Sequence, residues 1–309
     1  MIIKCGAIIL YSNCQKPKPF IINYSFNHYP VNKMLVFPDC KINLGLRILN
    51  KREDGYHNIE TIFYPLPFND ALEIILSHNT DPIIFSNSGL PVNGDSEDNL
   101  CVKAYWLLKK DFPELPCVKM HLHKCIPMGA GLGGGSADSA FTLQLLNKLF
   151  SLNLSIKQLV AYAAQLGSDC AFFILNTPCM ATGKGEILEP ITLDLSGYIL
   201  ALVNPGIHVS TREAFSVVQL HKATSNQLSL IEIINQPINT WQKFLVNDFE
   251  EGVSKTYPII KEIKEHLYKM GAVYAVMSGS GSSIFALFSK QLHPSLNIDL
   301  PFLVRLISL

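Results

Sequence analysis

A glycine-rich segment near the middle of the chain has the residue types and spacing of a phosphate-binding loop. Residues 127–140 read PMGAGLGGGSADSA and run directly into a segment with helical periodicity. Glycine adopts positive φ and has no side chain, so consecutive backbone N–H groups can converge on an anion. A helix that follows adds unpaired N–H groups and about half a positive charge at its N-terminus. The segment therefore predicts a site for a nucleotide phosphate.

Other glycine motifs fit this segment less well. Gly129, Gly131 and Gly134 match the spacing of the dinucleotide-binding fingerprint, but the acidic residue expected about 20 positions further on is missing. Ser136 follows Gly135, where an ordinary P-loop needs a lysine. The catalytic-loop and magnesium-loop motifs of protein kinases do not occur in the chain. These three classes are therefore disfavoured.

A flexible linker is the plain alternative to a phosphate loop. Linkers are flanked by polar, unstructured sequence. Here four apolar residues recur at helical spacing after the glycines, namely Ala137, Phe141, Leu145 and Leu149. This pattern favours a loop that opens a helix beginning at about Ser136.

A strand near the start of the chain carries a second group of polar side chains. In residues 41–48, KINLGLRI, every second residue is apolar, which predicts a half-buried strand. Lys41 and Asn43 then share its polar face, and Gly45 leaves room for a neighbour to approach. An Asp54-Gly55 turn leads into a second strand, and Tyr56 and His57 follow that turn directly.

Asp169 is a third candidate, with two interpretations. Ser155 is predicted to cap a helix that Gly167 ends, and Asp169 follows before the apolar residues 170–175. Asp169 either caps the next turn or acts as a catalytic carboxylate near the phosphates. Sequence spacing does not choose between these roles.

His121, His123 and Cys125 alternate along the segment VKMHLHKC, which places them on one face of a strand. A metal site is conceivable, but a fourth ligand is not evident. A polar outer face opposite Val118 and Met120 explains the pattern equally well, and we favour it.

Composition sets the broad class. The chain has 309 residues, of which 48% are hydrophobic, so about two domains with sizeable cores are expected, with a boundary near residue 195. Basic and acidic residues number 25 each, so no net field recruits nucleic acid or an anionic membrane. Eight cysteines without a CxxC pair suggest free thiols in a reducing cytoplasm. No apolar run reaches the roughly 18 residues of a membrane span.

Residues 1–33 differ from the rest of the chain. They contain no Asp or Glu and only faintly resemble a targeting segment. Because a regular strand pattern starts at Met34, we expect residues 1–33 to be an extension or the product of a misplaced start.

Further elements frame these groups. Asp98 or Asn99 is predicted to cap a helix with a stripe formed by Leu100, Ala104, Leu107 and Leu108. Residues 198–203 predict a buried strand, and residues 257–270 an amphipathic helix. A second glycine-serine turn, residues 278–283, opens into an apolar strand; its plain interpretation is a simple turn. Two loops of small residues also suggest closure on one ligand.

Together these pieces resemble the GHMP kinase superfamily, from Met34 to Phe288. The glycine loop PMGAGLGGGSA alone indicates the superfamily. KINLGL with DGYH and LGSDCAFF narrows the resemblance to members that act on a cytidine diphosphate-linked substrate. The other motifs of the resemblance are EDNL, TGKGEIL, NPG and MSGSGSSIFALF. This chain departs from the usual family pattern at two places. It has Asp39-Cys40 where the family usually has Asn-Ala, and Cys170-Ala171 where the family often has Val-Pro. Asp39 places a charge near Lys41.

The resemblance implies an α+β, two-domain GHMP kinase fold. Residues 34–194 would form a mixed α/β N-terminal domain that binds ATP. Residues 195–309 would form a smaller C-terminal α/β sandwich, and residues 1–33 lie outside the pattern.

The resemblance also implies roles for individual residues. Lys41 and Asp169 would form the catalytic pair: Asp169 takes or steers the proton of the attacking hydroxyl, and Lys41 keeps it ionised and orients the acceptor. Positions matching the ATP loop are Pro127, Met128, Gly129, Ala130, Gly131, Leu132, Gly133, Gly134, Gly135, Ser136 and Ala137, with Asn99 and Lys124 near the adenine. Positions matching substrate contacts are Asn43, Tyr56, His57 and Phe63.

The implied reaction is ATP-dependent phosphorylation of the 2-hydroxyl of 4-diphosphocytidyl-2-C-methyl-D-erythritol, in non-mevalonate isoprenoid biosynthesis. ATP is the co-substrate, Mg²⁺ follows from the ATP chemistry, and no protein carboxylate is assigned to it. We expect a cytoplasmic monomer or homodimer without nucleic-acid or membrane partners. The alternatives are another small-molecule kinase of the superfamily and a non-catalytic nucleotide-binding member.

Overall fold

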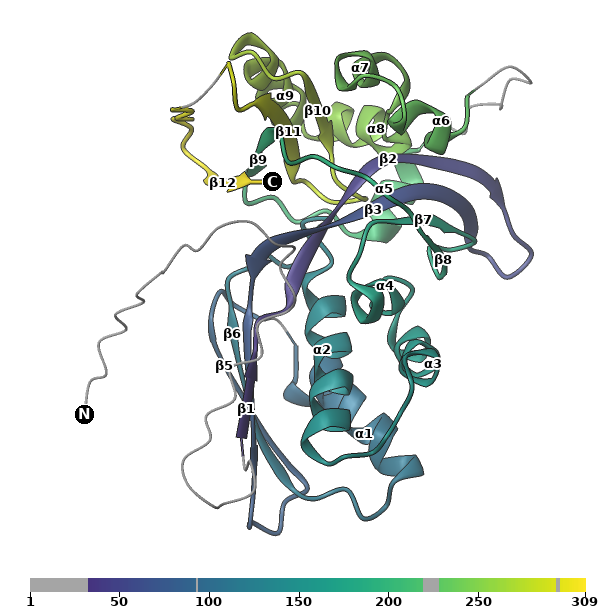
Figure 1. The fold of residues 1–309 in the computed structure, drawn as a ribbon, viewed down its shortest axis with the longest axis vertical. Coiled ribbons are helices and arrows are strands. Elements are labelled where there is room, and N and C mark those ends of the chain that lie inside the picture. Colours follow the sequence, from purple (N-terminus) through teal and green to yellow (C-terminus); the bar gives the residue numbers. More distant parts are fainter. Residues whose placement is uncertain (1–32, 93, 219–227, 293–294) are drawn as a thin grey trace.

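The computed structural model describes residues 33–92, 94–218, 228–292 and 295–309. Three four-stranded sheets and their helices build the fold (Figure 1). Within these ranges no helix is both long and apolar enough to cross a membrane. The predicted extension, residues 1–33, lies outside the described residues apart from Lys33.

The first sheet has one helix-covered face and one solvent face. Its order is β1 (Lys33–Val36), β4 (Ala71–Leu76), β6 (Val118–Lys124) and β5 (Ile83–Gly89), with β5 parallel to β6 and the other pairs antiparallel. Buried and exposed residues alternate strictly along β6. This is the pattern of a strand whose apolar face packs on the core while its polar face meets water.

α1 (Leu100–Asp111) and α2 (Gly134–Leu149) pack on the apolar face of this sheet, and α3 (Ile156–Leu166) and α4 (Cys170–Leu175) pack on these helices, on the side away from the sheet (Figure 1). A 3₁₀ turn, Ser96–Asp98, precedes α1. Asn99 caps α1, and Ser155 caps α3 through a capping box with Gln158. The buried face of α1 includes Ala104 and Leu108 as predicted, but Cys101 and Tyr105 take the places expected for Leu100 and Leu107. α2 begins at Gly134, two residues earlier than predicted.

The second sheet lies between the two halves of the molecule in Figure 1. Its order is β2 (Asp39–Lys51), β3 (His57–Asn69), β7 (Cys179–Thr182) and β8 (Ile187–Pro190), all antiparallel. The prediction of a half-buried strand at residues 41–48 is wrong, because β2 is buried on both faces there. Polar residues tolerate this position because they have partners: Lys41 pairs with Asp169, and Arg47 donates to the Leu228 carbonyl at 2.8 Å.

A bulge at Gly45 divides β2. The pairing register shifts between Leu44 and Leu46, and Gly45 has φ +71°. A Cβ atom at Gly45 would lie 2.6 Å from Cδ1 of Leu245, so the expected neighbour is an apolar side chain of the C-terminal half. Before the bulge Leu44 belongs to one core cluster, and after it Leu46 belongs to another.

The third sheet forms the C-terminal half. Its order is β10 (Tyr274–Met277), β11 (Ile284–Ser289), β9 (Tyr198–Asn204) and β12 (Leu303–Ser308), all antiparallel. Five helices and a 3₁₀ turn accompany it: α5 (Thr211–Val217), α6 (Leu230–Ile234), Ile238–Thr240, α7 (Trp241–Phe244), α8 (Asp248–Thr256) and α9 (Ile259–Lys269).

Both faces of this third sheet are buried along β9, β10 and β11, whereas the edge strand β12 is partly exposed. Ala201 and Val203 face the cluster that includes Phe249 and Ile263, on α8 and α9. Leu200 and Leu202 face the other way, into a cluster shared with Ile42 and Leu44 of β2. The C-terminal sheet is thus sandwiched between its own helices and the second sheet.

Candidate active site

Lys41 and Asp169 meet although they lie far apart in the chain. The Nζ atom of Lys41 is 3.5 Å from Oδ2 of Asp169, with 4% and 30% of the two side chains exposed. The ammonium group also lies 4.9 Å from the centroid of the Phe63 ring. The structure therefore holds a buried cation against a carboxylate that solvent and ligand can reach.

Asn43 fixes the position of Lys41 from within the strand. Its Oδ1 atom accepts a hydrogen bond from Lys41 Nζ at 2.6 Å, and its Nδ2 atom donates to Thr61 Oγ1 at 3.0 Å. Asn43 is 1% exposed. Both ends of its amide are engaged in the protein, so Asn43, predicted to contact substrate, orients the lysine in this arrangement.

Asp169 is placed at the start of α4 but does not cap it. Its side chain makes no capping hydrogen bond, and its Oδ1 accepts from Ser168 Oγ at 3.3 Å. Of its two interpretations, the structure thus disfavours the cap and leaves the carboxylate directed at Lys41.

Asp39 connects the strand that carries Lys41 to the helix that begins after Asp169. Asn176, which ends α4, donates to one carboxylate oxygen of Asp39, and Asn69 at the end of β3 donates to the other, both at 2.5 Å. Burial raises the pKa of Asp39, although the hydrogen bonds from Asn176 and Asn69 oppose it. Asp39 stands two residues before Lys41 and therefore links the strand of Lys41 to the helix of Asp169.

The glycine loop runs alongside Lys41. Gly129, Gly131 and Gly133 all have positive φ, and the backbone N–H of Lys41 donates to the Leu132 carbonyl at 2.9 Å. A Cβ atom at Gly133 would lie 3.2 Å from Cγ of Lys41. The first intrahelical hydrogen bond of α2 is donated by Ala137, so the preceding N–H groups open the helix without such partners. This matches the predicted anion cradle.

The two small-residue loops interlock. A Cβ atom at Gly131 would lie 1.9 Å from the Ser278 carbonyl oxygen, and one at Gly281 would lie 2.0 Å from the Gly131 nitrogen. Ser278 Oγ donates to the Gly131 carbonyl at 2.9 Å, and Ser283 N–H to that of Ala130 at 3.2 Å. Closure of both loops on one ligand stays a prediction, but their direct contact is now explained by the absence of side chains.

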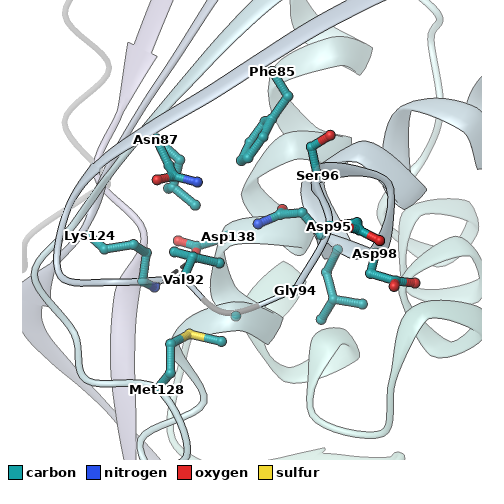
Figure 2. A pocket seen from close by; sticks show the side chains of 14 residues that line it. Phe85, Asn87, Val92, Gly94, Asp95, Ser96, Asp98, Lys124, Met128 and Asp138 are labelled. Carbon is teal, nitrogen blue, oxygen red and sulfur yellow. Dashed lines mark hydrogen bonds and ion pairs between the residues drawn. The ribbon is translucent and has the colours of Figure 1, made fainter.

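An open pocket of about 150 Å³ adjoins the glycine loop. Phe85 and Met128 lie on opposite sides of it in Figure 2, and Leu122 and Val92 add apolar surface. Asn99 and Gly135 also line it, and a Cβ atom at Gly135 would meet nothing closer than 3.6 Å. A planar apolar group fits such a pocket, with its anionic tail on the loop.

Lys124 lines the same pocket but its ammonium group is already paired. It donates to Asp138 Oδ2 at 2.8 Å (Figure 2) and to Asp70 Oδ2. All three side chains are almost fully buried. Burial lowers the pKa of Lys124, but the two carboxylates outweigh burial and raise it. The pKa of Asp138 is also raised, in this case because burial disfavours the charged carboxylate.

This buried triad fixes both ends of the glycine loop. Asp70 Oδ1 accepts from the N–H groups of Cys125 and Ile126, just before the loop, and Asp138 lies in α2, just after it.

The predicted substrate residues separate into two groups. Tyr56 is 60% exposed, and the His57 ring stacks on Phe215 of α5 with centroids 4.5 Å apart and planes at 13°. Phe63, in contrast, is 1% exposed and packs against Phe172 with centroids 5.1 Å apart. Phe63 therefore forms the wall beneath Lys41 and is not available to stack on a base.

The polar-face interpretation of His121 and His123 agrees with the structure. Both residues point away from the core on β6. His121 hydrogen-bonds Ser86 and Ser88 of the neighbouring strand at 2.8 and 2.9 Å, and His123 bonds Ser88 at 2.9 Å. Within the part of the chain that the structure describes, no three His, Cys, Asp or Glu side chains gather as a metal site.

Sequence reasoning missed several residues of this region. Phe215 follows a capped helix start, but nothing in its neighbourhood connects it with His57. Asn247 donates to the carbonyls of Met277 and Gly279 at 2.7 and 2.8 Å and thereby holds the second loop. Lys184 lay within the motif TGKGEIL but received no role. Of these three residues, only Lys184 could have been identified from the sequence, because it lies within a motif of the family.

Two family models match the chain. The GHMP kinases N terminal domain matches residues 99–177, and the GHMP kinases C terminal domain matches residues 229–295. The first match includes the glycine loop and Asp169, and the second includes the loop that interlocks with it. Together with the relatives below, these matches show that the chain belongs to the GHMP kinase family, whose two-domain α+β fold it has.

Relatives at higher identity share one name, 4-diphosphocytidyl-2-C-methyl-D-erythritol kinase. One from Bacteroides fragilis (strain YCH46) is 54% identical over 259 residues, which is 84% of this chain and 93% of the relative. One from Pelodictyon phaeoclathratiforme is 36% identical over 267 residues, covering 84% and 91%.

Solved structures agree with this placement. A crystal structure of 4-(cytidine 5'-diphospho)-2C-methyl-D-erythritol kinase matches with a TM-score of 0.69 and 30% identity, over 82% of this chain and 90% of that one. The homoserine kinase of Cytophaga hutchinsonii matches with a TM-score of 0.67 over 92% and 97%, and at 16% identity it shows the fold alone.

Proposed function

We propose that the protein transfers the γ-phosphoryl group of ATP to the 2-hydroxyl of 4-diphosphocytidyl-2-C-methyl-D-erythritol, giving the 2-phosphate and ADP. The observation that carries this proposal is the Lys41–Asp169 pair, 3.5 Å apart beside the glycine loop. The identity of the substrate is inferred from the names of the relatives described above. The product is a precursor in non-mevalonate isoprenoid biosynthesis.

ATP fits the residues present. Its base would enter the pocket between Phe85 and Met128, which Asn99 also lines. Its phosphates would lie on the loop of residues 127–137 and on the first turn of α2, where Gly135 leaves open space. The loop then leads the phosphates from the pocket to Lys41.

Mg²⁺ belongs to this proposal through the nucleotide. A magnesium ion in kinases is held by one or two protein groups together with phosphate oxygens. The described residues contain no larger cluster of carboxylates, which suits such a site. When bound, the ion neutralises charge on the transferred phosphoryl group.

Asp169 and Lys41 supply the chemistry of the acceptor. Asp169 accepts or directs the proton of the attacking hydroxyl, which must come within hydrogen-bond distance of its carboxylate. Lys41, held by Asn43, stands beside both the carboxylate and the loop. Its charge stabilises the negative charge that develops between the acceptor oxygen and the phosphoryl group.

The cytidine end of the substrate binds at Tyr56 and His57, with Phe215 beside them. The exposed Tyr56 ring offers a stacking surface, and His57 carries donors or acceptors for the edge of a cytosine. Phe215 orients the His57 ring by stacking on it. Phe63 contributes indirectly, as the wall beneath Lys41.

We infer that the protein works in the cytoplasm, as a monomer or a homodimer. Six cysteines in the described ranges are free, as in a reducing compartment.

Turnover assays test the proposal directly. The purified protein is incubated with ATP, Mg²⁺ and 4-diphosphocytidyl-2-C-methyl-D-erythritol, and ADP release is measured against homoserine and mevalonate as acceptors. We expect ADP release with the cytidine-linked substrate only. Turnover with homoserine or mevalonate instead would show that the protein is a different small-molecule kinase of the same family. ATP binding without turnover of any acceptor would support the non-catalytic alternative.

A further inference from the structure

The segment that follows β9 contains the NPG motif and then His208, and neither has a role in the mechanism so far. The Asn204 side chain donates to Ser283 Oγ at 3.0 Å, and Ser282 Oγ donates to the Ile207 carbonyl. Ser282 and Ser283 belong to the second small-residue loop, residues 278–283. These two hydrogen bonds therefore fix the segment to that loop.

The residues after His208 are anchored as well. Val209 is buried, with 2% of its surface exposed, and Thr211 Oγ1 shares a hydrogen bond with Ser280 Oγ at 3.2 Å. His208 itself is exposed. The backbone around His208 is therefore held in place, while its imidazole ring remains accessible to a ligand.

The ring of His208 lies on the glycine loop. A Cβ atom at Gly129 would lie 2.0 Å from Nδ1 and 2.1 Å from Cε1 of His208, so the ring occupies the space that a side chain there would need. Along the loop, Gly129 stands between Met128, which lines the pocket proposed for the base, and Gly133, which lies beside Lys41. The ring is therefore placed along the path proposed for the phosphates of ATP.

The ring nitrogens of His208 can bind a ligand. Among the residues that the structure describes, neither nitrogen has a hydrogen-bond or ion-pair partner. An imidazole always carries at least one N–H donor, and its protonated form carries two. A hydrogen bond to a charged phosphate oxygen is roughly twice as strong as one between neutral groups. An anion bound on the loop would therefore gain a donor from this ring.

We propose that His208 donates a hydrogen bond to a phosphate group of the bound nucleotide. This inference rests on the proposed function, because that function places the phosphates of ATP on the glycine loop. The backbone N–H groups of the loop and of the first turn of α2 form one side of the cradle. His208 adds a side-chain donor from the C-terminal half, so the nucleotide contacts both halves of the molecule.

Two rival roles for His208 are tested alongside this one. In the first, the ring only packs on Gly129 and supports the loop, a role that a phenylalanine ring without N–H donors would also fill. In the second, the ring contacts the phosphates of the acceptor, because the same segment leads into α5, where Phe215 stacks on His57. ADP contains base and phosphates, adenosine lacks the phosphates, and CDP probes the acceptor site.

The experiment compares the full-length wild type with His208→Phe, His208→Gln and the control His266→Phe, which alters an exposed histidine of α9. Dissociation constants for ADP, adenosine and CDP are measured by titration, with thermal melting as a check on folding. In His208→Phe we expect the affinity for ADP to fall about 10-fold, with the affinities for adenosine and CDP unchanged. Glutamine keeps an N–H donor, so His208→Gln should recover most of the affinity for ADP.

The kinetic readout should follow the same pattern. In His208→Phe the KM for ATP should rise about 10-fold, while the KM for the cytidine-linked substrate should change little. Unchanged affinity for ADP in His208→Phe, equal losses for ADP and adenosine, or a loss confined to CDP would each overturn the inference.

Turnover by the wild type decides the proposed function separately. If the wild type phosphorylates the cytidine-linked substrate, the proposed function survives whatever the His208 variants show. A wild type that neither binds ADP nor turns over that substrate would overturn both the proposed function and the inference about His208.

Discussion

At the scale of single residues, the site depends on buried polar groups that each have a partner. Lys41 is enclosed by Asn43, Asp169 and the face of Phe63, so its ammonium group cannot swing away from the glycine loop. Such preorganised charge is effective because it needs no rearrangement during the reaction. Single substitutions can therefore separate chemistry from binding.

Asp169→Asn keeps the size of the side chain but removes its charge and its ability to accept a proton. We expect kcat to fall by about 10²- to 10⁴-fold, with ATP affinity changed less than about twofold, because the proposed ATP site consists of the glycine loop and the pocket beside it. Steady-state kinetics and nucleotide titration measure the two effects. Asp299→Asn, at an exposed position, is the matched control. Normal turnover in Asp169→Asn would remove this residue from the mechanism.

Asp39→Asn should change how stability depends on pH. Because the pKa of Asp39 is raised in the folded protein, the folded state binds more protons than the unfolded state between the ordinary value near 3.8 and the raised value. The contribution of Asp39 to the free energy of unfolding therefore decreases as pH rises through this window.

The asparagine side chain in this variant does not titrate, so the stability of the variant relative to the wild type should increase from about pH 4 to pH 7. Urea unfolding at several pH values measures this difference. A constant difference across the range would contradict the assigned cause.

At the scale of elements, two loops of small residues are held against each other by backbone contacts. Gly131 and Gly281 approach so closely that neither position has room for a Cβ atom. Ser278 joins the contact by bonding to both Asn43 and Gly131. The glycine loop is thereby fixed to the C-terminal half.

Gly131→Ala should be much more costly than Gly135→Ala. Gly131 has φ +77° and its Cβ would meet the Ser278 carbonyl oxygen at 1.9 Å, so we expect a loss above about 2 kcal/mol together with a loss of activity. Gly135 lies within α2, where a Cβ atom would make only ordinary contacts, 3.6 Å from Met128 and 3.9 Å from Leu100, and alanine there should change stability by less than about 1 kcal/mol, in the favourable direction. Denaturant unfolding compares the variants; equal losses would contradict the interlocking contact.

At the scale of the whole molecule, the two halves share their cores. Ile42 and Leu44 of β2 lie in one cluster with Leu200 and Trp241, and Leu46 lies in another with Phe249. The boundary near residue 195 stays a prediction, and these clusters extend across it. A domain that unfolds independently is expected to have a core of its own.

We therefore expect that residues 34–194, expressed alone, do not fold cooperatively. Removal of the C-terminal half would expose the apolar face of the β2–β3 hairpin to water. Circular dichroism during urea unfolding should show a broad transition, and the fragment should bind the dye ANS, whereas the full chain should unfold sharply. A sharp transition in the fragment would show that the two halves fold independently.

The sequence alone predicted the local features well. The cap of α3, the strand at residues 198–203, the Asp54-Gly55 hairpin and the glycine loop before a helix all depend on neighbouring residues, whose conformational preferences act over short distances. The alternation along residues 41–48 was also real, but it predicted solvent on the polar face. The protein instead covers that face and gives Lys41, Asn43 and Arg47 each at least one hydrogen-bond partner, which alternation by itself cannot reveal.

Only the tertiary structure determined which distant residues are in contact. It brought Asp169 to Lys41, placed Phe215 against His57, buried Phe63 and pressed the second loop onto the first. Each of these contacts joins segments far apart in the chain, so it depends on the order of strands and the packing of sheets. The glycines and polar residues in the sequence determined which chemistry was available to this protein, whereas the packing of its two halves determined where that chemistry is assembled.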